Sequence, residues 1–203
     1  MSPQLLFTLF SFRKEITYVA TAFLLVILLP IIAVIVITRV GIDAVSDRLV
    51  EYDSVSGSVL IKNPKDGSIY KEIMGPFVWP VKGVITLEFG ESSIFQPFHT
   101  GIDIANPEGK KGDPITVFMP GKVIYAGSIF WGFGKHVLVD HGDNITSVYA
   151  HLDTINVEKG KQVKPGDVIG TEGKTGWATG NHLHFQINVF GIPVNPRVFL
   201  GGS

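Results

Sequence analysis

The strongest constraint on the fold of this chain is a stretch without any charged residue, from Ile16 to Thr38, which contains the sequence FLLVILLPIIAVIVI. A helix of about 20 apolar residues is long enough to cross the hydrocarbon core of a bilayer. Pro30 lies inside this stretch, but prolines are tolerated in lipid because neighbouring groups satisfy the freed carbonyl. The sequence therefore predicts one transmembrane α-helix over residues 16–38, which holds the chain in a lipid bilayer, after a short N-terminal segment, residues 1–15.

Two other interpretations of this stretch are a cleaved signal peptide and a buried core helix. A signal peptide has an apolar core of roughly 7 to 15 residues and a small-residue cleavage site, whereas Arg39 follows this longer stretch directly. An uncharged core helix of this length would be unusual. We expect an uncleaved anchor, whose orientation the positive-inside rule does not decide because Arg13 and Lys14 precede it and Arg48 also follows it.

Composition limits the function of the remaining residues. With 17 basic and 18 acidic residues, the chain lacks the positive field that would attract nucleic acid, and we expect no nucleic-acid partner. The chain has no cysteine, so a metal could be held only by His, Asp or Glu side chains. Its 23 glycines and 12 prolines, set among runs rich in Val, Ile and Thr, favour short strands joined by tight turns.

The chain beyond the anchor divides into two regions. We interpret residues 39–75 as a juxtamembrane spacer, in which SVLIKNPKDGSIYKEI could form two short strands around the turn signal Asn63–Gly67. Residues 76–203 contain short apolar runs separated by glycines, a pattern typical of antiparallel sheets. We predict a mostly β domain there, an antiparallel sheet or sandwich. The sequence does not indicate its oligomeric state.

Two segments place polar side chains opposite a core face. Between His99 and Ile104, strand alternation directs Ile102 and Ile104 to one face and the side chains of His99 and Asp103 to the other. The segment HLHFQI buries Leu183, Phe185 and Ile187 by the same argument, which leaves three residues together on the opposite face: His182, His184 and Gln186.

A third strand is expected from Ile145 to Leu152, where alternation would direct Ser147, Tyr149 and His151 to the same side. Four of the six histidines would then lie on polar strand faces. The remaining two, His136 and His141, have no partner at ligand spacing, and we expect structural roles for both.

Three motifs follow one another in a specific order: His99-xxx-Asp103, Tyr149-Ala150-His151-Leu152 and His182-Leu183-His184-Phe185. Together they resemble the signatures of the LytM/lysostaphin-type zinc endopeptidases, the M23 peptidase family. The segments WPVKG, VKPGDVIG and Thr175-Gly176 also follow the pattern of that family, and the resemblance extends from about Pro76 to Leu200. It implies a barrel-sandwich hybrid-like domain with one Zn²⁺ bound by His99, Asp103 and His184, and with His151 and His182 as catalytic histidines.

This set of residues suits amide hydrolysis. Catalytic zinc commonly takes three protein ligands and keeps a fourth position for a water, whose pKa falls to about 7. His151 and His182 could move protons or stabilise the oxyanion, and which of them is the base stays open.

The resemblance also implies a substrate, the peptide cross-bridges or stem peptides of peptidoglycan. A cell-wall substrate would place the domain on the extracytoplasmic side. The chain would then be a single-pass protein of the cell membrane, with its N-terminus in the cytoplasm.

Two alternative functions remain. The domain could be a metal-free M23-like regulator that activates another wall hydrolase, although the complete set of ligands and histidines argues against this. VKPGDVIG also resembles the hairpin of barrel-sandwich carriers and adaptors, which would suit a membrane-anchored adaptor. The adaptor hypothesis leaves the HxxxD and HLHF motifs unexplained.

Overall fold

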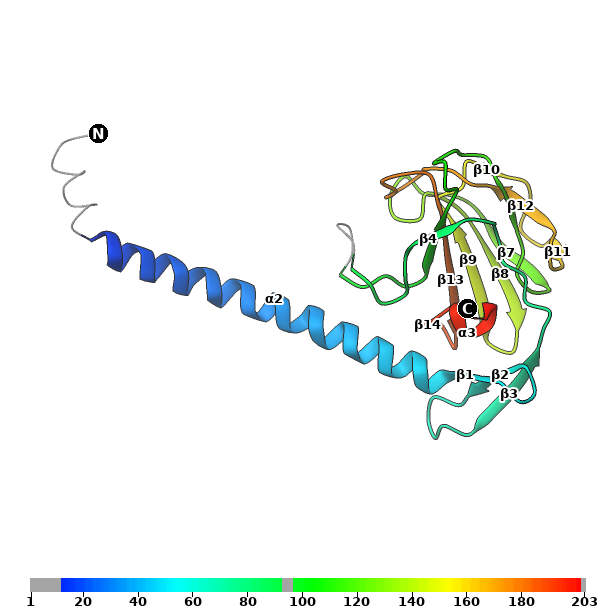
Figure 1. Ribbon diagram of the computed structural model, residues 1–203, viewed down its shortest axis with the longest axis horizontal. Coiled ribbons are helices and arrows are strands. Elements are labelled where there is room, and N and C mark those ends of the chain that lie inside the picture. The colour runs from blue at the N-terminus through cyan, green and yellow to red at the C-terminus, as the bar shows by residue number, and fades with distance from the viewer. Residues whose placement is uncertain (1–11, 93–96, 202–203) are drawn as a thin grey trace. The chain divides into compact units, whose positions relative to one another are not determined.

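The structure, a computed structural model, describes residues 12–92 and 97–201 (Figure 1). The chain forms two compact units, one extending to Val40 and the other beginning at Gly41. The first unit is helical, and the second contains all of the strands in the described residues.

Helix α2 (Arg13–Leu49) includes the predicted span and continues through Pro30 without a break. Its most apolar 18-residue window has a mean hydropathy of 3.1, and none of that window is buried. The helix is therefore long and apolar enough to cross a membrane, a property that signal sequences near an N-terminus share.

The helix extends beyond Thr38 because no proline follows in the next two turns. Its last residues belong to the second unit, where Ser46 and Leu49 are buried. The backbone N–H of Asn195 donates to Ser46 Oγ at 3.0 Å. The end of α2 is thus fastened to the C-terminal segment of the folded domain.

A small antiparallel sheet follows α2, in the order β1-β2-β3: β1 (Val50–Asp53), β2 (Ser58–Lys62) and β3 (Ile69–Met74). The two strands predicted around the Asn63–Gly67 turn are confirmed as β2 and β3, whereas β1 was not predicted. Val59 and Ile61 of this sheet are fully buried in the core. The region interpreted as a spacer therefore contributes to the folded domain.

Two further antiparallel sheets form the rest of the domain. The larger has the order β11-β7-β8-β9-β13-β5-β4, with β14 also paired to β13, and the smaller has the order β10-β12-β6. The strands are β4 (Val84–Leu87), β5 (Ile102–Ala105), β6 (Pro114–Thr116), β7 (Gly121–Ser128), β8 (Lys135–Gly142), β9 (Ile145–Ala150), β10 (Thr154–Ile155), β11 (Gln162–Val163), β12 (Val168–Thr171), β13 (Leu183–Val189) and β14 (Ile192–Val194). A short helix, α3 (Arg197–Leu200), follows β14. The predicted mostly β, antiparallel fold is confirmed (Figure 1).

The core lies on one face of the large sheet, and Phe118 is central to it. Its ring contacts Phe185 of β13 at a centroid distance of 5.4 Å, Phe77 at 6.3 Å and Phe199 at 6.1 Å. Burying a side chain of this size stabilises the fold by about 1.5–3 kcal/mol. Because Phe185 points into this core, its strand neighbour His184 points to the opposite face of β13.

Candidate metal centre

Strands β5 and β13 bring two of the predicted ligands together. In their antiparallel register Asp103 lies opposite His184, and Ile102 lies opposite Phe185. Residues that are paired across strands share a face, so Asp103 and His184 lie on one side while the two apolar residues pack into the core. The predicted opposition of polar and apolar faces is confirmed for these two strands.

His99 lies in the segment before β5, outside the strand in which alternation was applied to it. Its backbone is fixed by two hydrogen bonds, from His99 N–H to Glu91 O at 2.7 Å and from Gly90 N–H to His99 O at 2.9 Å. A Cβ on Gly101 would lie only 2.3 Å from Phe185 O, so glycine allows this segment to approach β13 closely.

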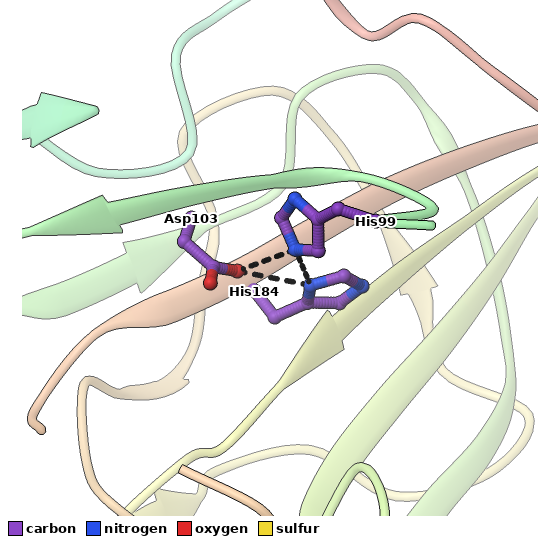
Figure 2. Close-up of side chains that lie close together, drawn as sticks. All are labelled: His99, Asp103 and His184. Atoms are coloured by element: carbon purple, nitrogen blue, oxygen red, sulfur yellow. Dashed lines mark hydrogen bonds and ion pairs between the residues drawn. The ribbon is translucent and has the colours of Figure 1, made fainter. Parts of the chain in front are cut away.

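The three predicted ligand residues form a close triangle of side-chain atoms (Figure 2). Asp103 Oδ1 lies 3.0 Å from both His99 Nε2 and His184 Nδ1. The two ring nitrogens lie 2.9 Å from each other. All three side chains are buried or nearly so.

The outer nitrogens of the two rings determine which atoms carry protons. His99 Nδ1 lies 3.0 Å from the carbonyl oxygen of Glu88, which can only accept, so this nitrogen carries the proton. His184 Nε2 likewise faces Gln186 Oε1 at 3.4 Å. The amide of Gln186 is oriented by Thr100, whose hydroxyl donates to Oε1 at 2.6 Å, and by its own donation to Asn188 at 2.7 Å. The inner nitrogens therefore present lone pairs.

The centre of the triangle thus contains two imidazole lone pairs and a carboxylate oxygen, with no proton between them in the neutral tautomers. Without a cation, a proton on an inner nitrogen of His184 or His99 takes that place and donates to Asp103. Burial opposes ionisation of Asp103, but these hydrogen bonds hold the pKa of its carboxyl well below the usual range. Two nitrogen donors and one ionised carboxylate match the ligands that Zn²⁺ takes in catalytic sites. The donor set therefore fits zinc.

A surface ion pair supports the carbonyl that orients His99. The guanidinium of Arg197 donates to both carboxylate oxygens of Glu88, from Nη2 to Oε1 at 2.6 Å and from Nε to Oε2 at 3.3 Å. The same guanidinium lies 5.7 Å from the ring centroid of Trp79. Glu88 is thus held by its side chain while its backbone oxygen faces His99.

The two predicted catalytic histidines lie beside this triangle. The rings of His151 and His182 are 4.8 Å apart, and His182 Nε2 lies 3.5 Å from Asp103 Oδ2. Each Nδ1 faces a backbone carbonyl, that of Thr175 at 2.8 Å for His151 and that of Gly180 at 3.1 Å for His182. Each Nδ1 therefore carries the proton, which leaves both Nε2 atoms as acceptors.

Burial also favours the neutral form of these two rings. Burial lowers the pKa of His151 to about 3, with further contributions from the charges of His184 and His182. Burial likewise lowers the pKa of His182, although Asp103 acts in the opposite direction. In this structure both rings are therefore neutral at pH 7.

The predicted phase of the third strand is wrong. Tyr149 pairs with Phe185 on the core face, and its hydroxyl accepts a hydrogen bond from Phe118 N–H at 3.0 Å. Strand β9 ends at Ala150, and His151 adopts φ = 63°, a left-handed conformation that is uncommon for residues other than glycine. This turn, rather than alternation, directs His151 to the site.

His136 and His141 remain outside the triangle, as predicted. His136 stacks on Tyr125 at a centroid distance of 4.6 Å, and its Nδ1 donates to Gly134 O at 2.9 Å. His141 is hydrogen-bonded to Pro120 and Ser147. Both histidines have structural partners.

A cavity of about 660 Å³ lies over the four site histidines and Asp103. One part of its wall is apolar and was not identified from the sequence. The signal that could have identified it is the run IFWGF, residues 129–133, which places four large apolar side chains in the connection between β7 and β8. The apolar residues of this part of the wall are Ile129, Trp131, Phe133 and Trp177, and Leu87 also lines the cavity.

Comparison with known proteins agrees with this geometry. Residues 97–196 match peptidase family M23. The murein hydrolase activator NlpD of Escherichia coli is 39% identical over 122 residues, which are 60% of this chain and 30% of NlpD. The chain thus spans less than a third of the length of this relative.

Two solved structures are similar in both sequence and fold. The catalytic domain of the prophage-encoded M23 protein EnpA from Enterococcus faecalis, crystallised as a point mutant, is 35% identical. The match has a TM-score of 0.52 and covers 63% of this chain and 96% of that domain. A zinc-containing peptidase from Vibrio cholerae is 29% identical, with a TM-score of 0.56, over 72% of this chain and 47% of that chain. The match to the family, the near-complete coverage of the EnpA domain and the shared β fold show that this chain belongs to peptidase family M23.

Proposed function

We propose that this protein is a zinc-dependent endopeptidase that hydrolyses peptide bonds in the cross-links or stem peptides of peptidoglycan. One observation carries the proposal. Three lone-pair donors converge at His99, Asp103 and His184, and two further histidines expose acceptor nitrogens to the same cavity. A purely structural cluster would instead pair each lone pair with a donor.

The proposed ligands of one Zn²⁺ are His99 through Nε2, His184 through Nδ1 and Asp103 through its carboxylate. When bound, zinc supplies a Lewis acid that polarises a carbonyl and makes a water more acidic. The backbone carbonyl of Glu88 and the side chain of Gln186 orient the two imidazoles.

His151 and His182 are the proposed proton-handling groups. Amide hydrolysis requires that a proton be taken from the attacking water and another be given to the leaving amine. Because each Nδ1–H is bound to a backbone carbonyl, each Nε2 can accept a proton without a change of tautomer. Asp103 Oδ2, at 3.5 Å from His182 Nε2, would stabilise positive charge on that ring.

The proposed location is the cell membrane, with residues 16–38 in the lipid bilayer, residues 1–15 in the cytoplasm and residues 76–203 on the extracytoplasmic side. The exposed apolar surface of α2 supports membrane association, and a wall substrate requires this orientation. The chain has no cysteine, so cysteines introduced at Ser54 and Ser128 should be labelled by an impermeant thiol reagent in intact spheroplasts. If both cysteines reacted with the reagent only after lysis, the domain would lie on the cytoplasmic side and the proposed orientation would be wrong.

A second candidate function is regulation of another wall hydrolase without bound metal. The 39% identity to a protein named as a murein hydrolase activator favours it. The two functions differ in what they require of the triangle, because only the enzyme needs it to bind zinc.

The experiment that separates the two functions uses the full-length protein in detergent micelles with purified sacculi of several cross-link chemistries. The enzyme should contain one zinc per chain and release new peptide termini, detected by mass spectrometry. Cleavage should be lost with chelator and return when zinc is added. A zinc-free protein that releases no termini but stimulates a separate wall hydrolase would favour the regulator.

A further inference from the structure

Two tryptophans form an aromatic surface on the cavity that the proposed mechanism does not use. Trp131 precedes β8, and Trp177 precedes β13. Their ring centroids are 6.1 Å apart with an interplanar angle of 49°, and the residues are 50% and 52% exposed. Large aromatic residues that remain half exposed beside a site commonly contact ligands.

The loops that carry the two rings are fixed to each other. Trp177 N–H donates to Gly132 O at 2.8 Å, and Gly134 N–H donates to Trp131 O at 3.2 Å. A Cβ on Gly176 would lie 2.3 Å from Gly132 O, so only glycine permits this close approach. The rings are therefore preorganised, which reduces the entropy lost when a ligand binds.

The same loops position His151. The carbonyl of Thr175 accepts the Nδ1–H of His151 at 2.8 Å, and Phe133 O accepts its backbone N–H at 2.9 Å. A group held by the two tryptophans is thus placed relative to the site histidines by short, hydrogen-bonded connections.

The part of the cavity wall around Trp131 and Trp177 is apolar, which limits the kind of ligand that can bind there. Ile129 and Phe133 also line the cavity, and none of the lining residues on these two loops, within 129–133 and 177–179, is ionisable. The backbone groups near the rings are used within the loops, for example Ile129 N–H donates to Gly134 O at 3.0 Å. An extended peptide would need such groups to pair as a strand. The wall instead suits a flat ligand with an apolar face and polar groups at its rim.

We propose that Trp131 and Trp177 form a subsite that stacks against a sugar ring of the glycan strand to which the substrate peptide is attached. A pyranose has an apolar C–H face, and its hydroxyl groups lie at the rim, where they keep their contact with water. This inference rests on the proposed function, because it takes the substrate to be peptidoglycan. It adds that the protein recognises the glycan as well as the peptide.

The test compares two muropeptides with the same peptide, one carrying its disaccharide and one freed of it. The full-length protein should show a KM for the sugar-bearing fragment that is lower by roughly tenfold. Trp131→Ala and Trp177→Ala should each remove most of this difference and leave the kinetics on the sugar-free peptide within about twofold. Phe130→Ala is the matched control, since Phe130 is on the same loop and 94% exposed but does not line the cavity.

A binding measurement makes the subsite testable even if the peptidase proposal fails. Titration calorimetry with N-acetylglucosamine tetramer should detect binding to the parent protein and to Phe130→Ala, and not to the Trp131→Ala, Trp177→Ala double variant. Equal KM values for the two muropeptides in the parent would overturn the subsite. So would equal losses on both fragments in the tryptophan variants, because these would indicate a structural role.

Discussion

Two clusters built around histidine side chains in this domain differ in how the ring nitrogens are hydrogen-bonded. At His141 each ring nitrogen has a complementary partner. Nδ1–H donates to Pro120 O at 2.7 Å, and Nε2 lies 2.8 Å from the hydroxyl of Ser147, which can donate to it. A hydrogen bond also joins the side chains of Ser147 and Tyr149, and the Tyr149 hydroxyl accepts from Phe118 N–H. Both ring nitrogens of His141 are therefore hydrogen-bonded, and neither is left to bind a metal ion.

In the group formed by His99, Asp103 and His184, hydrogen-bond acceptors face one another with no donor between them. His99 and His184 direct their protons outward, to Glu88 O and Gln186 Oε1, and present lone pairs inward to Asp103. In both groups one ring nitrogen donates to an oxygen that can only accept, so the difference lies at the other nitrogen. At His141 that nitrogen faces a hydroxyl, which can donate to it, whereas at His99 and His184 it faces only other acceptors and is left available to a cation.

The largest effect is expected from removing an inner acceptor. Asp103→Ala or His184→Ala should reduce bound zinc from one per chain to near zero and bring cleavage to background, because two ligands hold zinc poorly. His141→Gln, a change in the other group, should keep full zinc. Zinc is measured by atomic emission on freshly purified protein. Retention of zinc by both Asp103→Ala and His184→Ala would refute the ligand assignment.

Replacing His151 or His182, which flank the proposed metal ligands, should reduce the cleavage rate without removing zinc. His182→Ala and His151→Ala should keep zinc, while the cleavage rate falls by roughly 10²- to 10⁴-fold, the usual scale for losing a proton-transfer group. Zinc content and rate are measured on the same preparations. Near-parental cleavage by either variant would remove that residue from the mechanism. If His182→Ala lost zinc while His184→Ala kept it, the two roles would be exchanged.

The ion pair between Arg197 and Glu88, whose carbonyl orients His99, should affect the affinity of the protein for zinc. Arg197→Ala frees the Glu88 carboxylate, so the carbonyl that accepts from His99 is held less firmly. Loss of such outer interactions typically weakens metal binding by about 10- to 100-fold. Competition with a chelator measures the zinc Kd. Lys62→Ala, which breaks a surface ion pair with Glu51, is the control and should leave the Kd unchanged. An unchanged Kd in Arg197→Ala would show that the ion pair between Arg197 and Glu88 does not contribute to zinc binding.

The last prediction concerns the His141 group, which lies outside the metal centre, and it depends on pH. Burial lowers the pKa of His141 to about 4, although Pro120 O and the charge of Asp140 favour its protonation. The unfolded chain therefore binds this proton first as the pH falls. The free energy of unfolding contributed by neutral His141 is fully present above about pH 6.5. It is lost as the pH falls towards 4, by at most about 3.5 kcal/mol.

Urea unfolding of the zinc-loaded protein across this pH range checks this prediction. His141→Gln should lose less stability than the parent between pH 6.5 and 4, although it loses about 1 kcal/mol at pH 7 from imperfect hydrogen bonding. Parallel pH curves for the two proteins would show that His141 does not titrate in this range.

The sequence predicted the strand faces at β5 and β13 because alternation depends only on local geometry. It failed at His151, where a left-handed residue ends the strand, a feature that no residue type there signals. It also failed for the region around β1, since Val59 and Ile61 are buried by segments distant in sequence. The tryptophan surface depends on contacts between two loops, and such contacts have no periodic pattern.

Anomalous X-ray diffraction at the zinc edge can locate the metal ion that the inner acceptors of His99, Asp103 and His184 are proposed to hold. Crystals of the zinc-loaded protein should show one anomalous peak, bonded to His99 Nε2, His184 Nδ1 and an oxygen of Asp103. The Nδ1 of His99 should still face the Glu88 carbonyl. A zinc peak elsewhere, or a structure in which these three side chains bind no metal in the presence of excess zinc, would contradict the account.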